Sequence, residues 1–461
     1  MSTMDWVLVA VQGLVVVGFI ALGVRSGGIG LGLWGGVGTL VLVFVFGLDP
    51  GEPPFSAMLI IIAVVSAAAA MQAAGGVDYM VLVASKALRA RPKALNFVAP
   101  YVSYLLTILT GTSNTFFSII PVINEVAYAN KIRPERVLAG STVANALGIT
   151  SSPVAAAMAT MLPLVEIYDY DLVDVLLITI PASLIGILAM SIVMSRHGQE
   201  LDDDPEYQRR LAAGEVHPPA PSAEITLLPY AKRSVAIFLT GVLAICVFGF
   251  FEGIRPTVAA EGGGVEPMSV TPLIQMIMLT AAALILVLAH VNAGDIPGTP
   301  IFRSGMVAMI ALFGIAWMAD TFIANNEDAI VQALGSMAEN WPFMIAVAIF
   351  MVGALTTSQS AATRTMVPLG LALGIGAGYM IAMWTAVVGV LFLPANGTQI
   401  AAAEADETGT TNLGKRVVDH SFQLPLQICW VVTALTGIAI VWLFFGGHTP
   451  APPPATPVPT P

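Results

Sequence analysis

The chain has 461 residues, of which 57% are hydrophobic and only 10% are charged. This balance excludes an ordinary soluble domain and indicates an all-α polytopic membrane protein. The net charge of −11 comes without a basic stripe, and both cysteines, Cys246 and Cys429, fall in apolar stretches. The sequence therefore supports neither a nucleic-acid partner, nor a disulfide framework, nor a metal cluster.

Ten apolar stretches are long enough to cross the hydrocarbon core as helices, which takes about 20 residues each. They are predicted at residues 5–24, 28–48, 56–74, 137–167, 174–195, 234–252, 271–291, 304–324, 379–402 and 423–446. The first is not expected to be a signal peptide, because Asp5 rather than a cationic segment precedes it. Residues 196–233 are predicted to be a cytoplasmic linker, and residues 447–461, which are rich in Pro, a disordered tail.

Two further apolar stretches, residues 95–128 and 341–373, are predicted to be re-entrant hairpins. Basic residues flank the first on both sides: Lys86, Arg89, Arg91 and Lys93 precede it, and Lys131, Arg133 and Arg136 follow it. Because Lys and Arg accumulate on the cytoplasmic side, this stretch should enter and leave the membrane there. The second has no basic flank and should open to the outside. With both chain ends outside, nearly all of the 18 basic residues then lie in the cytoplasm.

Short polar segments interrupt the apolar pattern at matched positions in the two halves. Ser151, in a Thr-Ser-Ser-Pro segment, follows Ser113 by 38 residues, and Asn396 follows Ser358 by the same 38 residues. Helix interruptions persist inside a bilayer only where they line a cavity, because unpaired polar groups there cost several kcal/mol. The matched pair predicts an inverted repeat of two five-span halves, residues 1–195 and 234–446, each with one hairpin and one broken helix. The alternative is that these small polar residues merely pack helices closely.

Several collinear stretches resemble the anaerobic C4-dicarboxylate transporter (Dcu) family over nearly the whole chain. They are residues 25–33 (RSGGIGLGL), 48–54 (LDPGEPP), 132–136 (IRPER), 302–306 (FRSGM), 314–319 (GIAWMA), 408–411 (TGTT) and 420–422 (HSF). The resemblance implies secondary transport of fumarate, succinate, malate or aspartate across the bacterial inner membrane. The hairpin tips are also similar to those of divalent-anion/sodium symporters, which implies an elevator-type carrier and a homodimer in membrane lipid.

The chain departs from the family pattern in the polar segments. The family has Gly-His where this chain has Ser113-Asn114, Tyr-Pro-Ser-Asp where it has residues 396–399, and an apolar residue at Arg364. Substrate choice and coupling, whether to a sodium ion, to a proton or by antiport, therefore stay open. No cofactor is implied.

Two sets of residues follow for the site. Backbone N–H groups at helix starts favour anions, so the expected substrate-binding residues are Ser113, Asn114, Thr115, Ser151, Ser358, Gln359, Ser360, Arg364, Asn396 and Thr398. Hydroxyl and carbonyl oxygens of the same segments suit a hard cation, so the expected cation-binding residues are Thr112, Thr150, Ser152, Thr357 and Gly397.

Arg364 is the sharpest single candidate in these sets. An Arg within the membrane costs roughly 3 kcal/mol on insertion scales and usually marks a pathway or a pair. Its planar fork matches a carboxylate, so substrate contact is one interpretation. The alternatives are an ion pair with Asp320 or Glu404, or a side chain that extends toward the membrane surface.

Two other classes of protein were weighed against a carrier. An intramembrane enzyme is disfavoured, because the five histidines fall mostly at span ends, in the linker or in the tail. A carrier or channel for another small organic anion is a closer alternative, because re-entrant hairpins also build channel filters. Saturable flux with counter-exchange would separate a carrier from a channel.

Overall fold

The computed structural model describes residues 3–26, 29–53, 55–216, 226–259, 264–340, 343–414 and 419–445. These residues are mostly helical, as the sequence predicts. Their single sheet is an antiparallel pair, β1 (Thr257–Ala259) and β2 (Val265–Pro267), with Val258 opposite Glu266. The predicted tail and the Pro-rich part of the linker lie outside the described residues.

The first half of the chain contains nine α-helices in the described residues, and two short 3-10 segments lie at its breaks. The helices are α1 (Thr3–Ser26), α2 (Gly30–Phe44), α3 (Phe55–Ala73), α4 (Gly76–Ala90), α5 (Leu95–Thr110), α6 (Phe116–Ala129), α7 (Pro134–Leu147), α8 (Ala156–Glu166) and α9 (Leu172–Met194). The 3-10 segments are Ser113–Thr115 and Gly148–Ser151.

The described residues of the linker and the second half are also mainly helical. Their helices are α10 (Pro205–Ala212), α11 (Ala231–Phe250), α12 (Val270–Leu288), α13 (Pro300–Asn340), α14 (Met344–Thr356), α15 (Gln359–Ala372), α16 (Ala377–Trp384), α17 (Gly397–Ala405) and α18 (Gln423–Phe444). A 3-10 segment, Thr385–Leu391, continues α16, and α13 is interrupted by non-helical dihedrals at Asn326.

Six described helices are long and apolar enough to cross a membrane: α1, α9, α11, α12, the part of α13 up to Asn326, and α18. Two bent pairs qualify when each is taken together, α3 with α4 at 73° and α7 with α8 at 40°. The prediction of a polytopic membrane protein is therefore supported, but with six to eight such elements rather than ten. The predicted span 28–48 is α2, which has only 15 residues, and the predicted span 379–402 is divided between α16 and α17.

Helix α4 is the element that the sequence analysis missed. One face of α4 buries Val77, Met80, Val81 and Leu88, whereas Lys86 on the opposite face is exposed. Such an amphipathic helix has a low average hydropathy, so a search for long apolar runs passes over it.

Both predicted hairpins correspond to a helix, a sharp break and a second helix that packs back on the first. In the first, α5 ends at Gly111, whose φ of 68° lies in the left-handed region. A Cβ atom at Gly111 would come within 2.6 Å of the Val154 carbonyl oxygen, so only glycine fits without strain. In the second, α14 and α15 are joined at Thr357, which adopts a φ of 49° although it is not a glycine.

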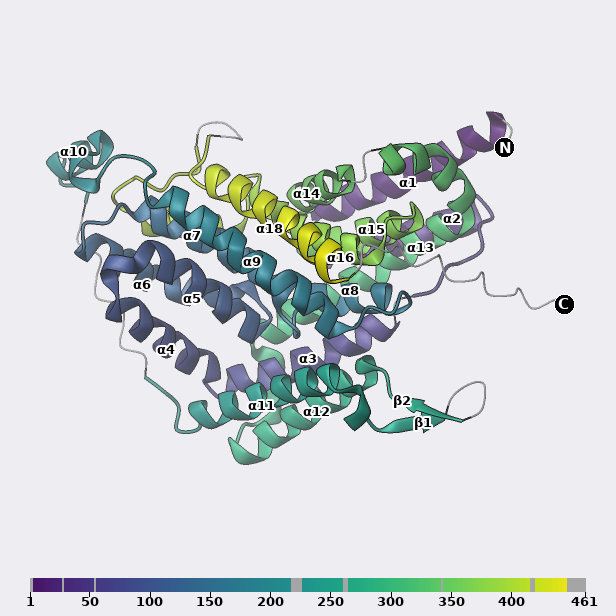
Figure 1. The fold of residues 1–461 in the computed structure, drawn as a ribbon, viewed down its shortest axis with the longest axis horizontal. Coiled ribbons are helices and arrows are strands. Elements are labelled where there is room, and N and C mark those ends of the chain that lie inside the picture. Colours follow the sequence, from purple (N-terminus) through teal and green to yellow (C-terminus); the bar gives the residue numbers. More distant parts are fainter. Residues whose placement is uncertain are drawn as a thin grey trace.

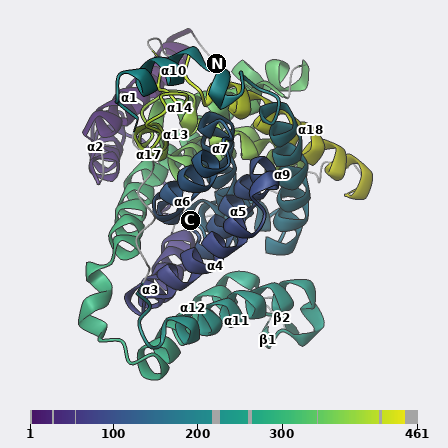
Figure 2. The same ribbon diagram turned by 90° about the vertical axis from the view of Figure 1, so that its left-hand side faces the viewer.

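The helices form an inner and an outer group. In the inner group α5, α7, α9, α16 and α18 pack on one another and run side by side in Figure 1. In the outer group α1 and α2 pack on α13, at the upper left of Figure 2, and α11 and α12 pack on α3, at the bottom of that view. Helix α2 crosses α13 at Gly32 and Gly314, where a Cβ atom on either glycine would meet backbone of the other helix at 2.0 Å or less.

The described part of the linker docks on the α6–α7 connection and on the start of α7 through ion pairs. Lys131 pairs with Asp202 at 2.7 Å, Arg136 with Glu200 at 3.0 Å, and Arg133 with Asp204. Asp204 also caps α10 by accepting N–H bonds from residues 206 and 207. Burial by itself raises the pKa of the Asp204 carboxyl, but these N–H bonds and the Arg133 guanidinium together hold it below its ordinary value.

Candidate functional site

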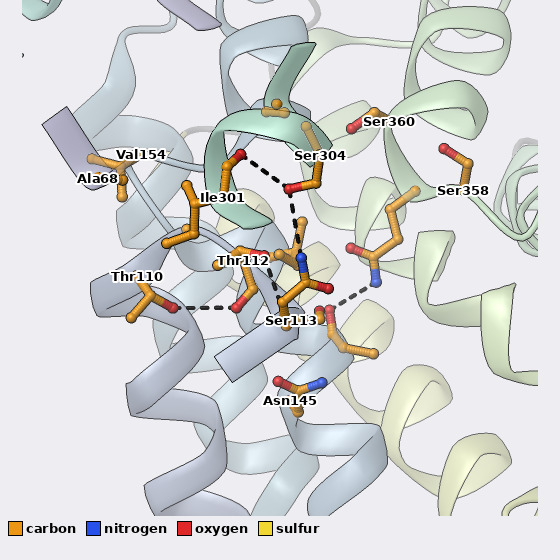
Figure 3. Close-up of a pocket in the computed structure, with 18 of the residues that line it drawn as sticks. Ala68, Thr110, Thr112, Ser113, Asn145, Val154, Ile301, Ser304, Ser358 and Ser360 are labelled. Atoms are coloured by element: carbon orange, nitrogen blue, oxygen red, sulfur yellow. Dashed lines mark hydrogen bonds between the residues drawn. The ribbon is translucent and has the colours of Figure 1, made fainter. Parts of the chain in front are cut away.

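A cavity of about 380 Å³ lies where the two hairpin tips meet the two helix breaks. The first tip contributes residues 110–114 and the second contributes residues 357–360. The floor comes from α7 and from the start of α17, and the remaining wall comes from α3 and from the beginning of α13. Figure 3 shows Thr112 and Ser113 on one side of this space and Ser358 and Ser360 on the other. Segments from both halves of the chain thus enclose one space.

The first tip is held by hydrogen bonds among its own hydroxyl groups. Thr110 Oγ1 donates to the Thr112 carbonyl oxygen at 3.2 Å, and Thr112 Oγ1 accepts the Asn114 N–H at 3.2 Å. Asn114 Nδ2 then reaches Ser304 Oγ of α13 at 3.5 Å, a contact visible in Figure 3. The side chain of Asn114 therefore connects the tip to the wall of the cavity.

The second tip is held by a cap and by one long side chain. Ser358 Oγ accepts the Ala361 N–H at 3.2 Å, which caps α15. Gln359 Nε2 donates to the Ala146 carbonyl oxygen of α7 at 2.8 Å, so this tip is connected to the floor. The other amide atom, Gln359 Oε1, is buried without a hydrogen-bond partner in the described structure.

The cavity combines helix starts, neutral polar side chains and no charge. Helices α8 and α15 begin at residues that line it, the N-cap residue of α17, Asn396, also lines it, and the 3-10 turn before α6 begins at Ser113. The first N–H groups of a helix lack partners within the helix, and the helix dipole is positive at that end. None of the residues that line the cavity is charged. Such an arrangement binds an anion through N–H dipoles rather than through a counter-charge.

Most of the predicted substrate-binding residues lie in this cavity. Those that line it are Ser113, Asn114, Ser358, Gln359, Ser360, Asn396 and Thr398. Thr115 does not line it, because its hydroxyl turns back to the Thr112 carbonyl oxygen at 3.2 Å. Ser151 is fully buried and its Oγ lies 3.3 Å from Ser183 Oγ, away from the cavity.

The predicted cation-binding residues are divided in the same way. Thr112 and Thr357 line the cavity. Thr150 and Ser152 are buried and donate to the carbonyl oxygens of Leu147 and Ile108 at 2.9 and 2.7 Å, so they support the break rather than face the cavity. Gly397 is not part of the lining and lies toward Phe117. Cation binding at these positions stays a prediction.

Arg364 lies outside the cavity between the tips. It is 2% exposed, so the guanidinium does not extend to the surface, and it makes no ion pair with Asp320 or Glu404. It lines a second cavity together with Asp320, one helical turn beyond Ser360 on α15. The expected direct role of Arg364 beside the tip residues is not supported by this arrangement.

Two functional candidates were missed by the sequence analysis. Asn145 of α7 is fully buried and lines the cavity; its Oδ1 accepts from Thr107 Oγ1 at 2.5 Å, whereas its Nδ2 has no partner in the described residues. Ser304 lines the opposite wall. An Asn inside an apolar span was the available signal for Asn145, because such residues usually face a bundle interior. For Ser304 the available signal was its place in residues 302–306 (FRSGM), one of the stretches that carry the family resemblance.

Comparison with known proteins places the chain in a family. A sequence model described as anaerobic C4-dicarboxylate membrane transporter matches residues 8–445. The chain is 38% identical over 447 residues to the anaerobic C4-dicarboxylate transporter DcuB of Escherichia coli O6:H1, which covers 95% of this chain and 98% of the relative. It is 38% identical over 430 residues to the C4-dicarboxylate transporter DcuA of Wolinella succinogenes, covering 93% and 98% of the two chains.

One solved structure shares the fold. It is the crystal structure of the YdaH transporter of Alcanivorax borkumensis, with a TM-score of 0.55 at 14% sequence identity, covering 90% of this chain and 89% of that one. At this identity the likeness concerns the fold alone.

Proposed function

The chain belongs to the anaerobic C4-dicarboxylate membrane transporter family, and we propose that it carries a C4-dicarboxylate across the bacterial inner membrane as a secondary active transporter. The substrates in this class are fumarate, succinate, malate and aspartate. The activity is transport and not catalysis. We place the binding site in the cavity between the hairpin tips.

The observation that carries the site is the convergence of helix starts on an uncharged cavity. A dicarboxylate brings two negative charges that must leave water, which is costly unless donors replace the lost hydration. One carboxylate would accept from the first tip and Asn114, and the other from the start of α15 at Ser360. Asn145 Nδ2, which is buried and unmatched, supplies a further donor. Neutral donors bind the dianion without the tight pairing that would slow its release.

Alternating access is proposed to use the two helix groups. The order of hairpin, broken helix and single long helix is α5–α6, α7–α8, α9 in the first half and α14–α15, α16–α17, α18 in the second. The bend between α3 and α4 has its counterpart in the break of α13 at Asn326. These matches support an inverted repeat in which the inner group moves as an elevator against the outer group. Chain termini on the outside, a homodimer and coupling to a sodium ion or a proton belong to the same proposal.

Counterflow in liposomes tests the function. Purified protein is reconstituted into vesicles loaded with unlabelled succinate, and entry of labelled fumarate, succinate, malate and aspartate is measured with and without a sodium gradient. We expect saturable entry that depends on the internal dicarboxylate. If no dicarboxylate exchanges with protein that is folded and inserted, the proposed function is wrong. Thr240→Ala is the matched control, because its hydroxyl bonds only to the Ala236 carbonyl oxygen of its own helix.

A further inference from the structure

A second cavity, of about 370 Å³, lies between α8, α13 and α15 and shares no lining residue with the cavity between the tips. Its lining includes Arg364 of α15, Asp320 of α13 and Glu52 of the α2–α3 connection. Apolar side chains such as Leu164 and Leu312 make up most of the remaining lining. The space is large enough for a small organic molecule.

Arg364 has the features of a ligand-binding group without its ligand. The side chain is 2% exposed, and its Nε and Nη1 atoms are buried without a hydrogen-bond partner in the described residues. A buried charge that is neither paired nor hydrogen-bonded is strongly destabilising, so proteins rarely keep one without a use for it. At least two donors of one guanidinium therefore lack acceptors, which points to an anionic group that binds there.

The two carboxylates of the same cavity are also without a cation. Asp320 Oδ2 accepts the Glu52 N–H at 2.8 Å, which holds the two acidic residues together, and both are exposed at their end of the cavity. Neither carboxylate forms an ion pair with Arg364 or with another basic residue in the described structure. Opposite charges thus line one cavity and remain apart.

We propose that this cavity binds a small α-amino acid as its zwitterion. The carboxylate of the ligand pairs with the Arg364 guanidinium, and its ammonium group pairs with Asp320 and Glu52. A ligand with only a carboxylate would be repelled by the two acids, and one with only an ammonium group would be repelled by Arg364. The apolar lining residues, such as Leu164 and Leu312, accommodate a short aliphatic side chain. This inference does not depend on the proposed transport of dicarboxylates, because it concerns another cavity.

The test uses ligands that differ by one charge. Full-length protein in lipid nanodiscs is titrated by calorimetry with L-alanine, with propionate, which lacks the ammonium group, and with ethylamine, which lacks the carboxylate. L-Alanine carries only one carboxylate and so does not resemble a dicarboxylate substrate. We expect L-alanine to bind at least about tenfold more tightly than either analogue, a difference of about 1.4 kcal/mol.

Variants assign the two ends of the ligand. Arg364→Met should weaken L-alanine binding at least about tenfold. Asp320→Asn should weaken L-alanine but strengthen propionate, because it removes a repulsion from the carboxylate; a purely structural role of Asp320 would not reverse sign between the two ligands. Thr240→Ala should change neither. The fold of each variant is checked by its thermal unfolding.

Three results would overturn the proposal. The first is absence of L-alanine binding to folded wild-type protein. The second is equal affinity for L-alanine and propionate with no effect of Asp320→Asn, which would indicate a simple carboxylate site. The third is that Arg364→Met and Asp320→Asn both lower the midpoint of thermal unfolding of the ligand-free protein while the wild type does not bind L-alanine. This would indicate that Arg364 and Asp320 pair directly in another conformation.

Discussion

The first hairpin turns at Gly111, whereas the second turns at Thr357, and both residues have a positive φ. Both tips then present neutral polar side chains to one cavity. Farther along, the hairpins differ: the residue seven positions after Gly111 is Ser118, which is exposed and uncharged, whereas the residue seven positions after Thr357 is Arg364, which is buried and charged.

The difference between the hairpins shows that the tips and the arms meet different structural requirements. The tips need exposed N–H groups and small polar side chains, so both halves retain that chemistry even though the turn residues differ. The arms need only to pack against their neighbours, and the first arm has no charged side chain at the position of Arg364. A charged, unpaired side chain in the second arm does not improve packing, and it is better explained by a ligand of the cavity that it lines.

The largest expected effect comes from giving the first turn the residue type of the second. Gly111→Thr should abolish measurable dicarboxylate exchange, because a Cβ atom would meet the Val154 carbonyl oxygen at 2.6 Å and a β-branched residue is strained at this φ. Counterflow in liposomes measures the loss. Retained exchange would show that the first tip tolerates displacement and does not shape the site.

The second effect concerns the charged arm. Arg364→Met should raise the apparent midpoint of thermal unfolding of the ligand-free protein, because it removes a buried charge that costs roughly 3 kcal/mol within a membrane. Met is unbranched and fills much of the same volume. Ile119→Met, at a buried apolar position of the first arm, is the control and should alter the midpoint little. A lower midpoint for Arg364→Met would show that the guanidinium has a stabilising partner.

The third prediction tests the floor of the cavity. Asn145→Leu should weaken the apparent affinity for dicarboxylate about tenfold or more, because a hydrogen bond to a charged group is worth about 1.5–3 kcal/mol. Labelled uptake at increasing substrate concentration gives the affinity, with Thr240→Ala as the control. An unchanged affinity would mean that Asn145 Nδ2 does not contact the substrate.

The fourth prediction is the reverse exchange of turn residues. Thr357→Gly should stabilise the protein by about 1 kcal/mol, because relief of a strained φ, about 1–3 kcal/mol, exceeds the added entropy of glycine in the unfolded chain. Thermal unfolding in detergent is the measurement. Destabilisation would indicate that contacts of the Thr357 side chain outweigh the strain of its backbone.

The smallest effect concerns the ion pairs between the linker and the residues that follow the first hairpin. The pKa of Asp204 is lowered in the folded protein, so its contribution to linker docking is present above its ordinary value of 3.8 and is lost as the pH falls through the folded value. The backbone amides of α10 should therefore be equally protected from hydrogen exchange between about pH 5 and about pH 8. Asp204→Asn should lower the protection at neutral pH, whereas Asp203→Asn, at an exposed position, should not. Equal protection in both variants would contradict the role of Asp204.

The sequence predicted the elements of this molecule better than their contacts. Apolar runs located the spans, and the matched polar segments located both hairpins and both helix breaks, because hydrocarbon forbids such segments except at a cavity. Helix α4 was missed because its apolar residues occupy one face only. Two predicted spans are a short helix and a divided one, because run length does not distinguish a continuous helix from a broken one.

What the sequence by itself predicted is that two polar breaks at equal spacing lie inside a membrane and meet, and the structure brings residues of both segments to one cavity. Only the tertiary structure decided which side chains face that cavity. Thr115 and Ser151 turn to neighbouring oxygens, Asn145 enters the floor, and Arg364, one helical turn after Ser360, lines a different cavity. The physical reason is that the neighbours of a side chain depend on its face and on its height along the helix, and the packing of distant helices decides which of these positions border a cavity.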